Sequence, residues 1–201
     1  MRKTVFVAAI ASAAMTLGVG VTQTVSQADS GSYQIAQIRG SGAALTDSYG
    51  IQVPDVNYRR DWVQLGTFSI RADEAKDGAG QLHIVYAPKE AVEKYRSGGD
   101  FPSGTILVKD VFKTKSEDLP TGFVSYAHEL AGRFVMVRDK EGKLAGKNPL
   151  WGDGWGWAFF EGNEKVKTVT TDYKADCLGC HQPAKDTNWL YVRGYPVLGN
   201  K

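Results

Sequence analysis

The stretch GTILVKDVFKTK, residues 104–115, is the strongest indicator of the fold class in this chain. In an extended chain, successive side chains point to opposite faces. One face then carries Ile106, Val108, Asp110 and Phe112, and the other carries Leu107, Lys109, Val111 and Lys113. Apolar residues fall on both faces, so we predict one long β-strand, with a single lysine and a single aspartate inside its apolar part.

Shorter strand-like runs lie on both sides of it. We predict strands within residues 67–71, 82–87, 122–130, 155–161 and 165–171, and a hairpin over 133–146 with Gly142 in its turn. Helices are few: a helical turn at 58–63, a helix at 88–97 that begins at Pro88 and stops at Gly98-Gly99, and a helix at 172–182. This order predicts an α+β fold, mainly an antiparallel sheet with a few packed helices, as one domain over residues 54–201.

The first residues have the order of a secretory signal peptide. Arg2 and Lys3 form a basic head, an apolar run follows over 5–21, and Ser26-Gln27-Ala28 resembles a cleavage site. The alternative is a retained membrane anchor, but polar residues and glycines interrupt the run, which is short for a spanning helix. We predict a signal peptide at 1–28, a flexible leader at 29–53, a periplasmic location, and no membrane association after cleavage.

The charge pattern excludes some partner classes. Once Arg2 and Lys3 are set aside, basic and acidic residues are equal in number, and no basic block or acidic tail is present. We therefore expect no nucleic-acid partner.

Both cysteines lie in the pentapeptide CLGCH, residues 177–181. Cys-x-x-Cys-His is the attachment pattern of a c-type haem. Each thiol can add to one haem vinyl group, one helical turn sets the spacing of the two sulfurs, and His181 can place an imidazole nitrogen on the iron. We predict one covalent haem c held by Cys177, Cys180 and His181.

Three plainer readings of CLGCH stay open: a redox dithiol, half of a zinc site, or chance. A thioredoxin-like dithiol usually starts a helix in a βαβ pattern, which this chain lacks. A tetrahedral zinc site needs two more ligands, and no second cysteine pair exists. Haem attachment explains the pattern better than any of these.

The iron has a second axial position. Outside the predicted signal peptide, the candidate ligands are Met136, His83 and His128, and none has a local signature. A core methionine and ordinary half-buried or surface histidines are the commoner explanations. A simple electron carrier would use one of the three as a sixth ligand; otherwise the distal site is open to small molecules.

The stretches GTILVKDVF, GWGWAFF and CLGCHQPAKDTNWLYVRGYPVL resemble the cytochrome P-460 family, which includes the gas-binding cytochromes c-prime-beta. The similarity runs from about residue 58 to residue 198. It implies a mostly antiparallel β fold, a homodimer, a five-coordinate c-type haem and a periplasmic setting. Members with the full active site oxidise hydroxylamine to nitrous oxide or nitrite, and a soluble acceptor takes the electrons.

The resemblance also implies a role for Lys109. In hydroxylamine-oxidising members a lysine nitrogen is bonded to a meso carbon of the porphyrin, and Lys109 lies at the matching strand position. Its sequence context alone leaves two alternatives: burial among its apolar neighbours, or extension of the amine to solvent.

Other candidate residues are less specific. A carboxylate near the iron would accept protons from hydroxylamine; Asp172 is the first candidate and Glu161 the second, although Asp172 also suits a helix N-cap. Arg193 is a candidate partner for a haem propionate, or a plain surface arginine. Gas-binding relatives cover the distal face with phenylalanines, for which the eligible residues are Phe68, Phe101, Phe112, Phe123 and Phe134.

Three functions therefore compete. The first is a haem enzyme that oxidises hydroxylamine, the second a cytochrome that binds nitric oxide without hydroxylamine turnover, and the third a simple electron carrier. A bond between Lys109 and the haem would distinguish the first function from the second.

Overall fold

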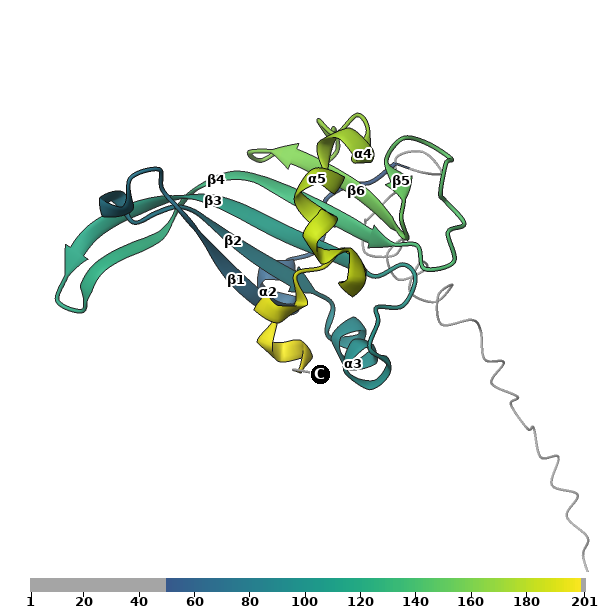
Figure 1. Ribbon diagram of the computed structural model, residues 1–201, viewed down its shortest axis with the longest axis horizontal. Coiled ribbons are helices and arrows are strands. Elements are labelled where there is room, and N and C mark those ends of the chain that lie inside the picture. The colour runs from purple at the N-terminus through teal and green to yellow at the C-terminus, as the bar shows by residue number, and fades with distance from the viewer. Residues whose placement is uncertain (1–49, 200–201) are drawn as a thin grey trace, which may run out of the picture.

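The computed structural model describes residues 50–199, which form one antiparallel sheet of six strands in the order β1-β2-β3-β4-β6-β5 (Figure 1). The strands are β1 (Val63–Arg71), β2 (Ala79–Ala87), β3 (Ile106–Leu119), β4 (Gly122–Arg138), β5 (Trp151–Gly152) and β6 (Trp155–Glu161). The α-helices are α2 (Tyr58–Asp61), α3 (Lys89–Gly98), α4 (Tyr173–Asp176) and α5 (Leu178–His181). Short 3-10 helices are η1 (Ala75–Asp77), η2 (Gln182–Thr187), η3 (Val192–Gly194) and η4 (Pro196–Leu198). The predicted α+β class is confirmed.

Both faces of the sheet are covered, and this explains the two-sided apolar pattern of β3. Leu107 and Met136 pack on one face with α3 and the C-terminal segment from Tyr173 to Leu198. Val108 and Val135 pack on the other face with α2 and the residues before it. Figure 1 shows α4 and α5 crossing over the strands, with α2 behind them.

The predicted signal peptide, residues 1–28, lies outside the described residues, as does most of the predicted leader, 29–53. The last part of that leader is packed. Ile51 and Val53 are buried in the core behind the sheet, and the Val53 amide donates to the Lys165 carbonyl over 2.9 Å. The packed domain therefore includes residues before 54.

The predicted hairpin over 133–146 is wrong. β4 is one continuous strand, and it pairs with β3 and β6 instead of with residues 143–146. Buried Asp139 ends the strand: its carboxylate accepts from the amides of Lys143 and Leu144 at 2.9 and 2.8 Å. These bonds fold residues 139–146 into turns, one of which holds Gly142 at a φ of 66°.

The predicted strand at 165–171 does not join the sheet. Along the outer edge of β6 one backbone bond, from the Val169 amide to the Phe159 carbonyl at 2.9 Å, is combined with bonds from threonine side chains. The Phe159 amide donates to the Thr170 hydroxyl at 2.9 Å, and the Thr168 hydroxyl donates to the Phe159 carbonyl at 2.8 Å. The alternating threonines that suggested a strand are therefore hydrogen-bonding partners of that edge.

The predicted helix at 172–182 is divided. Asp172 begins α4, and Cys177, with φ −124° and ψ −45°, interrupts the helix before α5 starts at Leu178. The interruption turns the buried Cys177 towards the sheet, whereas Cys180 remains exposed on α5. Within residues 50–199, no helix is both long and apolar enough to cross a membrane.

Candidate functional site

A cavity of about 610 Å³ lies between the sheet and the C-terminal helices. Its floor is made by residues of β1, β2, β3, β4 and β6. Its roof is made by α4, α5 and the segment from Leu190 to Tyr195. The volume is in the range of small-molecule and cofactor pockets, and most of the lining is apolar.

Cys177, Cys180 and His181 all line this cavity. Both cysteines are free thiols; Cys177 lies at the break before α5, and Cys180 follows one helical turn later within α5. Burial raises the pKa of the Cys177 thiol to about 11, and the nearby Asp176 carboxylate adds to the effect. The Cys177 thiol is thus protonated at neutral pH beside an apolar pocket.

The ring of His181 is held by the backbone. Its Nδ1 lies 2.6 Å from the Trp189 carbonyl oxygen, which can only accept, so Nδ1 carries the proton. This leaves Nε2 with the lone pair that a metal ion needs. The Trp157 ring meets the imidazole edge-on, with 5.0 Å between ring centroids. Burial and, to a lesser extent, Lys109 lower the pKa of His181, which favours the neutral imidazole.

Lys109 lines the same cavity from β3, where it pairs with Phe134 on β4. Its Nζ lies 4.2 Å from the centroid of the Phe134 ring. Burial lowers the pKa of the amine. Of the two alternatives for Lys109, burial is therefore the correct one: the amine faces the cavity that the two cysteines also line.

His83 lies beside Lys109 in the cavity wall. On β2 it sits between Phe68 of β1 and Val111 of β3. Its Nε2 is 2.9 Å from Gln81 Oε1, an acceptor, so Nε2 donates and Nδ1 keeps a lone pair. Burial and the charge of Lys109 lower the pKa of His83 to about 4. Sequence reasoning considered His83 only as an iron ligand and missed its place in the cavity wall as a neutral imidazole.

The other proposed sixth ligands are placed differently. Met136 is a core residue of β4 that also touches the cavity. His128 is exposed on the far part of β4 and does not line the cavity.

Of the eligible phenylalanines, Phe68 and Phe134 line the cavity. Phe101 is fully buried in the core, Phe112 packs against Arg59, and Phe123 is exposed. Sequence reasoning missed Phe159, which lines the cavity and contacts the ring of Phe134 at 4.3 Å between centroids. The sheet register reveals the link, because Phe134 and Phe159 are paired on β4 and β6.

The three remaining candidates do not line the cavity. Asp172 caps α4 by accepting from the Lys174 amide at 2.8 Å, Glu161 is exposed at the end of β6, and Arg193 is exposed in η3. Asp176 is the one carboxylate among the described lining residues, and it accepts from the amides of Thr171 and Asp172. On the opposite wall, Ala131 contributes a small apolar side chain.

A comparison with known protein families shows to which family the chain belongs. The family model described as Cytochrome P460 matches residues 56–192, which include the whole cavity floor and the CLGCH segment. The chain belongs to the cytochrome P460 family. Among curated proteins no similar sequence is found.

As a member of the cytochrome P460 family, the chain is a haem-binding cytochrome. The residues fit this group in three respects. The cavity is large and apolar, the His181 Nε2 has a lone pair available for iron, and two free thiols stand one helical turn apart on the same wall. Lys109 and His83 would supply polar contacts on the wall formed by the sheet.

Proposed function

We propose that this cytochrome P460 family member carries one covalent haem c and oxidises hydroxylamine at an open distal site. Cys177 and Cys180 would form the thioether bonds, and His181 would bind the iron. A single observation carries the proposal: the amine of Lys109, the two thiols and the His181 imidazole line one cavity. Hydroxylamine oxidation in this family uses such a lysine next to the haem.

The residues of the cavity suit this chemistry. Conversion of two hydroxylamine molecules to nitrous oxide and water releases four electrons and four protons; the haem supplies the path for the electrons to a soluble acceptor. The protons need a base within hydrogen-bond reach. His83 is neutral at pH 7, because its pKa is lowered to about 4, and its Nδ1 can accept. Burial lowers the pKa of Lys109 from its usual value, which is the direction that eases loss of the proton needed for a bond to the porphyrin edge.

The test compares the wild-type protein, made with a c-type maturation system, with Lys109→Met and the control Lys113→Met. Lys113 is on the same strand and the same side chain face, but it is exposed and paired with Glu129 at 3.1 Å. We expect one haem by intact mass, a strongly red-shifted ferrous Soret band, and hydroxylamine-dependent reduction of a dye acceptor. Lys109→Met should restore an ordinary c-type Soret band and reduce turnover at least about tenfold; Lys113→Met should change neither.

An ordinary Soret band and no turnover in the wild-type protein would contradict the enzyme proposal. They would favour the second function, binding of nitric oxide. The aromatic wall made by Phe68, Phe134 and Phe159, together with the small Ala131, favours that alternative, because this wall admits a diatomic gas and holds no carboxylate. The lining carboxylate of Asp176 lies on the opposite wall and accepts from backbone amides. A six-coordinate low-spin spectrum that changes on replacement of Met136 or His83 would instead indicate a simple electron carrier.

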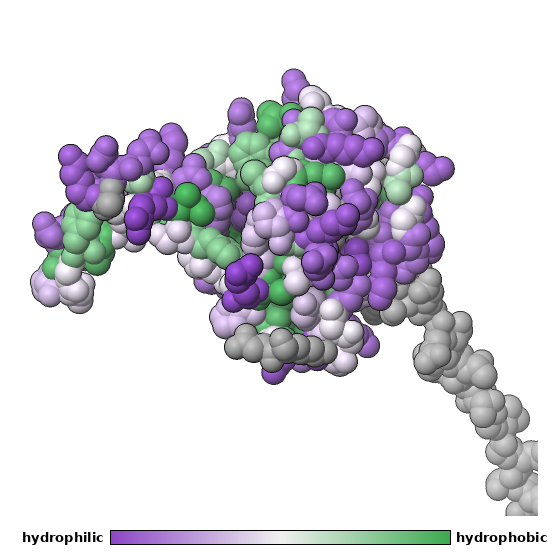
Figure 2. Space-filling model, in the orientation of Figure 1, coloured by the Kyte–Doolittle hydropathy of each residue, from purple (hydrophilic) through white to green (hydrophobic). Residues whose placement is uncertain are grey.

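We also propose an exported, periplasmic homodimer, in keeping with the family resemblance. The outer part of β3 and β4 forms an arm, residues 114–128, that projects beyond the covered part of the sheet (Figure 1). Leu119, Phe123 and Tyr126 on this arm are 45%, 52% and 38% exposed. Figure 2 shows hydrophobic surface on the arm among polar side chains. Exposed apolar surface of this kind is typical of a contact between protein chains.

A further inference from the structure

Two consecutive residues next to the haem motif have left-handed backbones. Asn188 and Trp189 have φ values of 54° and 64°. Asparagine tolerates this region, but for a bulky residue such as tryptophan it is an outlier that the surrounding structure must hold in place. Such strain tends to occur at functional sites, so the question is what the turn achieves.

The turn directs one carbonyl group. It follows η2, where the Trp189 amide bonds back to the Ala184 carbonyl at 2.8 Å, and it buries the Trp189 ring against Trp157. In this position the Trp189 carbonyl accepts from His181 Nδ1 at 2.6 Å. The strained turn therefore sets the hydrogen bond that orients the histidine.

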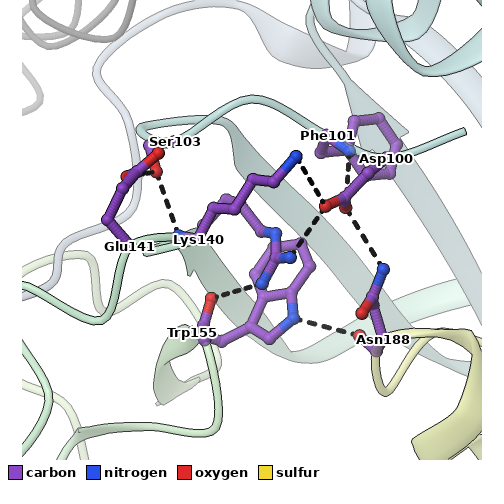
Figure 3. Close-up of polar contacts among 9 residues, drawn as sticks. Asp100, Phe101, Ser103, Lys140, Glu141, Trp155 and Asn188 are labelled. Atoms are coloured by element: carbon purple, nitrogen blue, oxygen red, sulfur yellow. Dashed lines mark hydrogen bonds and ion pairs between the residues drawn. The ribbon is translucent and has the colours of Figure 1, made fainter. Parts of the chain in front are cut away.

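Residues from three other elements hold the turn (Figure 3). Trp155 of β6 donates from Nε1 to the Asn188 carbonyl at 3.0 Å. The Asn188 amide nitrogen Nδ2 lies 3.3 Å from Asp100 Oδ1, in the loop between α3 and β3. Arg138, at the end of β4, joins the two contacts: it pairs with Asp100 at 2.9 Å and stacks on Trp155 at 5.0 Å.

The side chains that hold Asn188 are largely buried. The Trp155 side chain is fully buried, and those of Arg138 and Asp100 are 7% and 18% exposed. The Asp100 carboxylate also accepts from the Phe101 amide at 2.8 Å, so its orientation is set on its own loop. The Asn188 backbone thus rests on a rigid base made of the ends of β4 and β6.

We propose that Asp100, Asn188 and Trp155 are positioning residues that set the strength of the hydrogen bond between His181 Nδ1 and the Trp189 carbonyl, and thereby the electron donation of His181 to the haem iron. The inference rests on the proposed function, in which His181 is the iron ligand. A stronger bond at Nδ1 gives the imidazole more anionic character, which strengthens its bond to iron and stabilises the ferric state.

The experiment uses the haem-loaded protein and two readouts other than activity. These are the iron–histidine stretching band in the resonance Raman spectrum of the ferrous protein, and the reduction potential. The variants are Trp155→Phe, which removes the donor to Asn188 and keeps an aromatic ring, and Asn188→Asp, which keeps the shape and the tolerance of a left-handed backbone but places a carboxylate against Asp100. Because each variant weakens the hydrogen bond at His181 Nδ1, both should shift the iron–histidine band to lower frequency and raise the reduction potential. The double variant should show the largest change in both.

Lys140→Ala is the matched control. Lys140 also contacts Asp100, at 3.5 Å, but its side chain is 55% exposed. The variant should leave both readouts at the wild-type values. Asn188→Gly, which keeps the backbone and loses only the side-chain bond, should lie between wild type and Asn188→Asp.

The outcomes are distinguishable. A wild-type protein without an iron–histidine band would overturn both the proposed ligand and this inference. A wild-type band that is unchanged in Asn188→Asp and Trp155→Phe would overturn the inference alone. Asn188 is exposed, so its aspartate variant remains informative even if replacement of the buried Trp155 prevents folding.

Discussion

At the level of single residues, β3 carries two neighbouring charged residues whose side chains lie on opposite faces of the sheet. Lys109 faces the cavity, and Asp110, which is fully buried, faces the other side of the sheet. Asp110 accepts from the Tyr58 hydroxyl at 2.8 Å and from Arg59 Nε at 2.6 Å, and Arg133 lies 3.7 Å away. A slip of one residue in β3 would exchange the two faces, so this ionic cluster helps to fix the register that points Lys109 at the cavity.

Replacing Asp110 with asparagine should therefore be costly. The variant removes the carboxylate charge and leaves the buried Arg133 without its counter-charge. We expect a loss of about 3 kcal/mol in the free energy of unfolding, measured by denaturant titration. Asp61→Asn is the control, because Asp61 pairs with Arg60 on the surface, where water screens the pair, and should have little effect. Equal effects of the two variants would contradict the prediction.

His83 gives a prediction about pH. Its pKa is lowered from 6.5 to about 4, mainly by burial, so the unfolded chain binds the proton more readily than the folded protein. Stability from this group is complete above pH 6.5 and is lost as the pH falls towards 4. We expect His83→Gln to reduce this loss by about 1–3 kcal/mol in unfolding titrations at pH 7 and pH 4.5. His128→Gln, on the exposed arm, is the matched histidine control.

At the level of the elements, the segment that carries CLGCH depends on its caps. Asp172 accepts from the Lys174 amide at the start of α4. Because α4 has only four residues, loss of this cap would also affect the backbone at Cys177, which follows it directly. Asp172→Ala should cost about 1 kcal/mol, or a Tm decrease of about 2–4 °C. A large fall in hydroxylamine turnover with unchanged Tm would instead assign Asp172 to proton transfer, as the sequence suggested.

At the level of the whole molecule, the arm of β3 and β4 exposes apolar side chains that no other part of residues 50–199 covers. If it forms the proposed dimer contact, a charge at the apolar Phe123 should weaken association. Phe123→Asp should shift the molar mass in light scattering from dimer towards monomer, with the haem spectrum unchanged. Lys115→Asp, a charge change on the same exposed arm, serves as the control. A wild-type monomer would disprove the dimer.

Much of this protein followed from local patterns in the chain. The alternation in residues 104–115 indicates the central strand, because a strand buried on both faces needs apolar side chains on both. CLGCH indicates the haem site, because thiol spacing and the adjacent histidine are properties of one helical turn. Gly99, which ends α3 with a φ of 77°, was also predictable, because glycine adopts that conformation without strain.

Other features depend on contacts between residues far apart in the chain, which no local pattern encodes. The threonines at 168 and 170 alternate like a strand, yet they bond to the edge of β6. Phe159 and His83 join the cavity only because the sheet register aligns them with Phe134 and Phe68. The left-handed conformation is tolerated by Asn188 but disfavoured by Trp189, and Asp100 and Trp155, from distant elements, hold the turn there. Short-range periodicity thus predicts which segments form strands and where the haem motif lies, whereas packing between elements determines which side chains surround it.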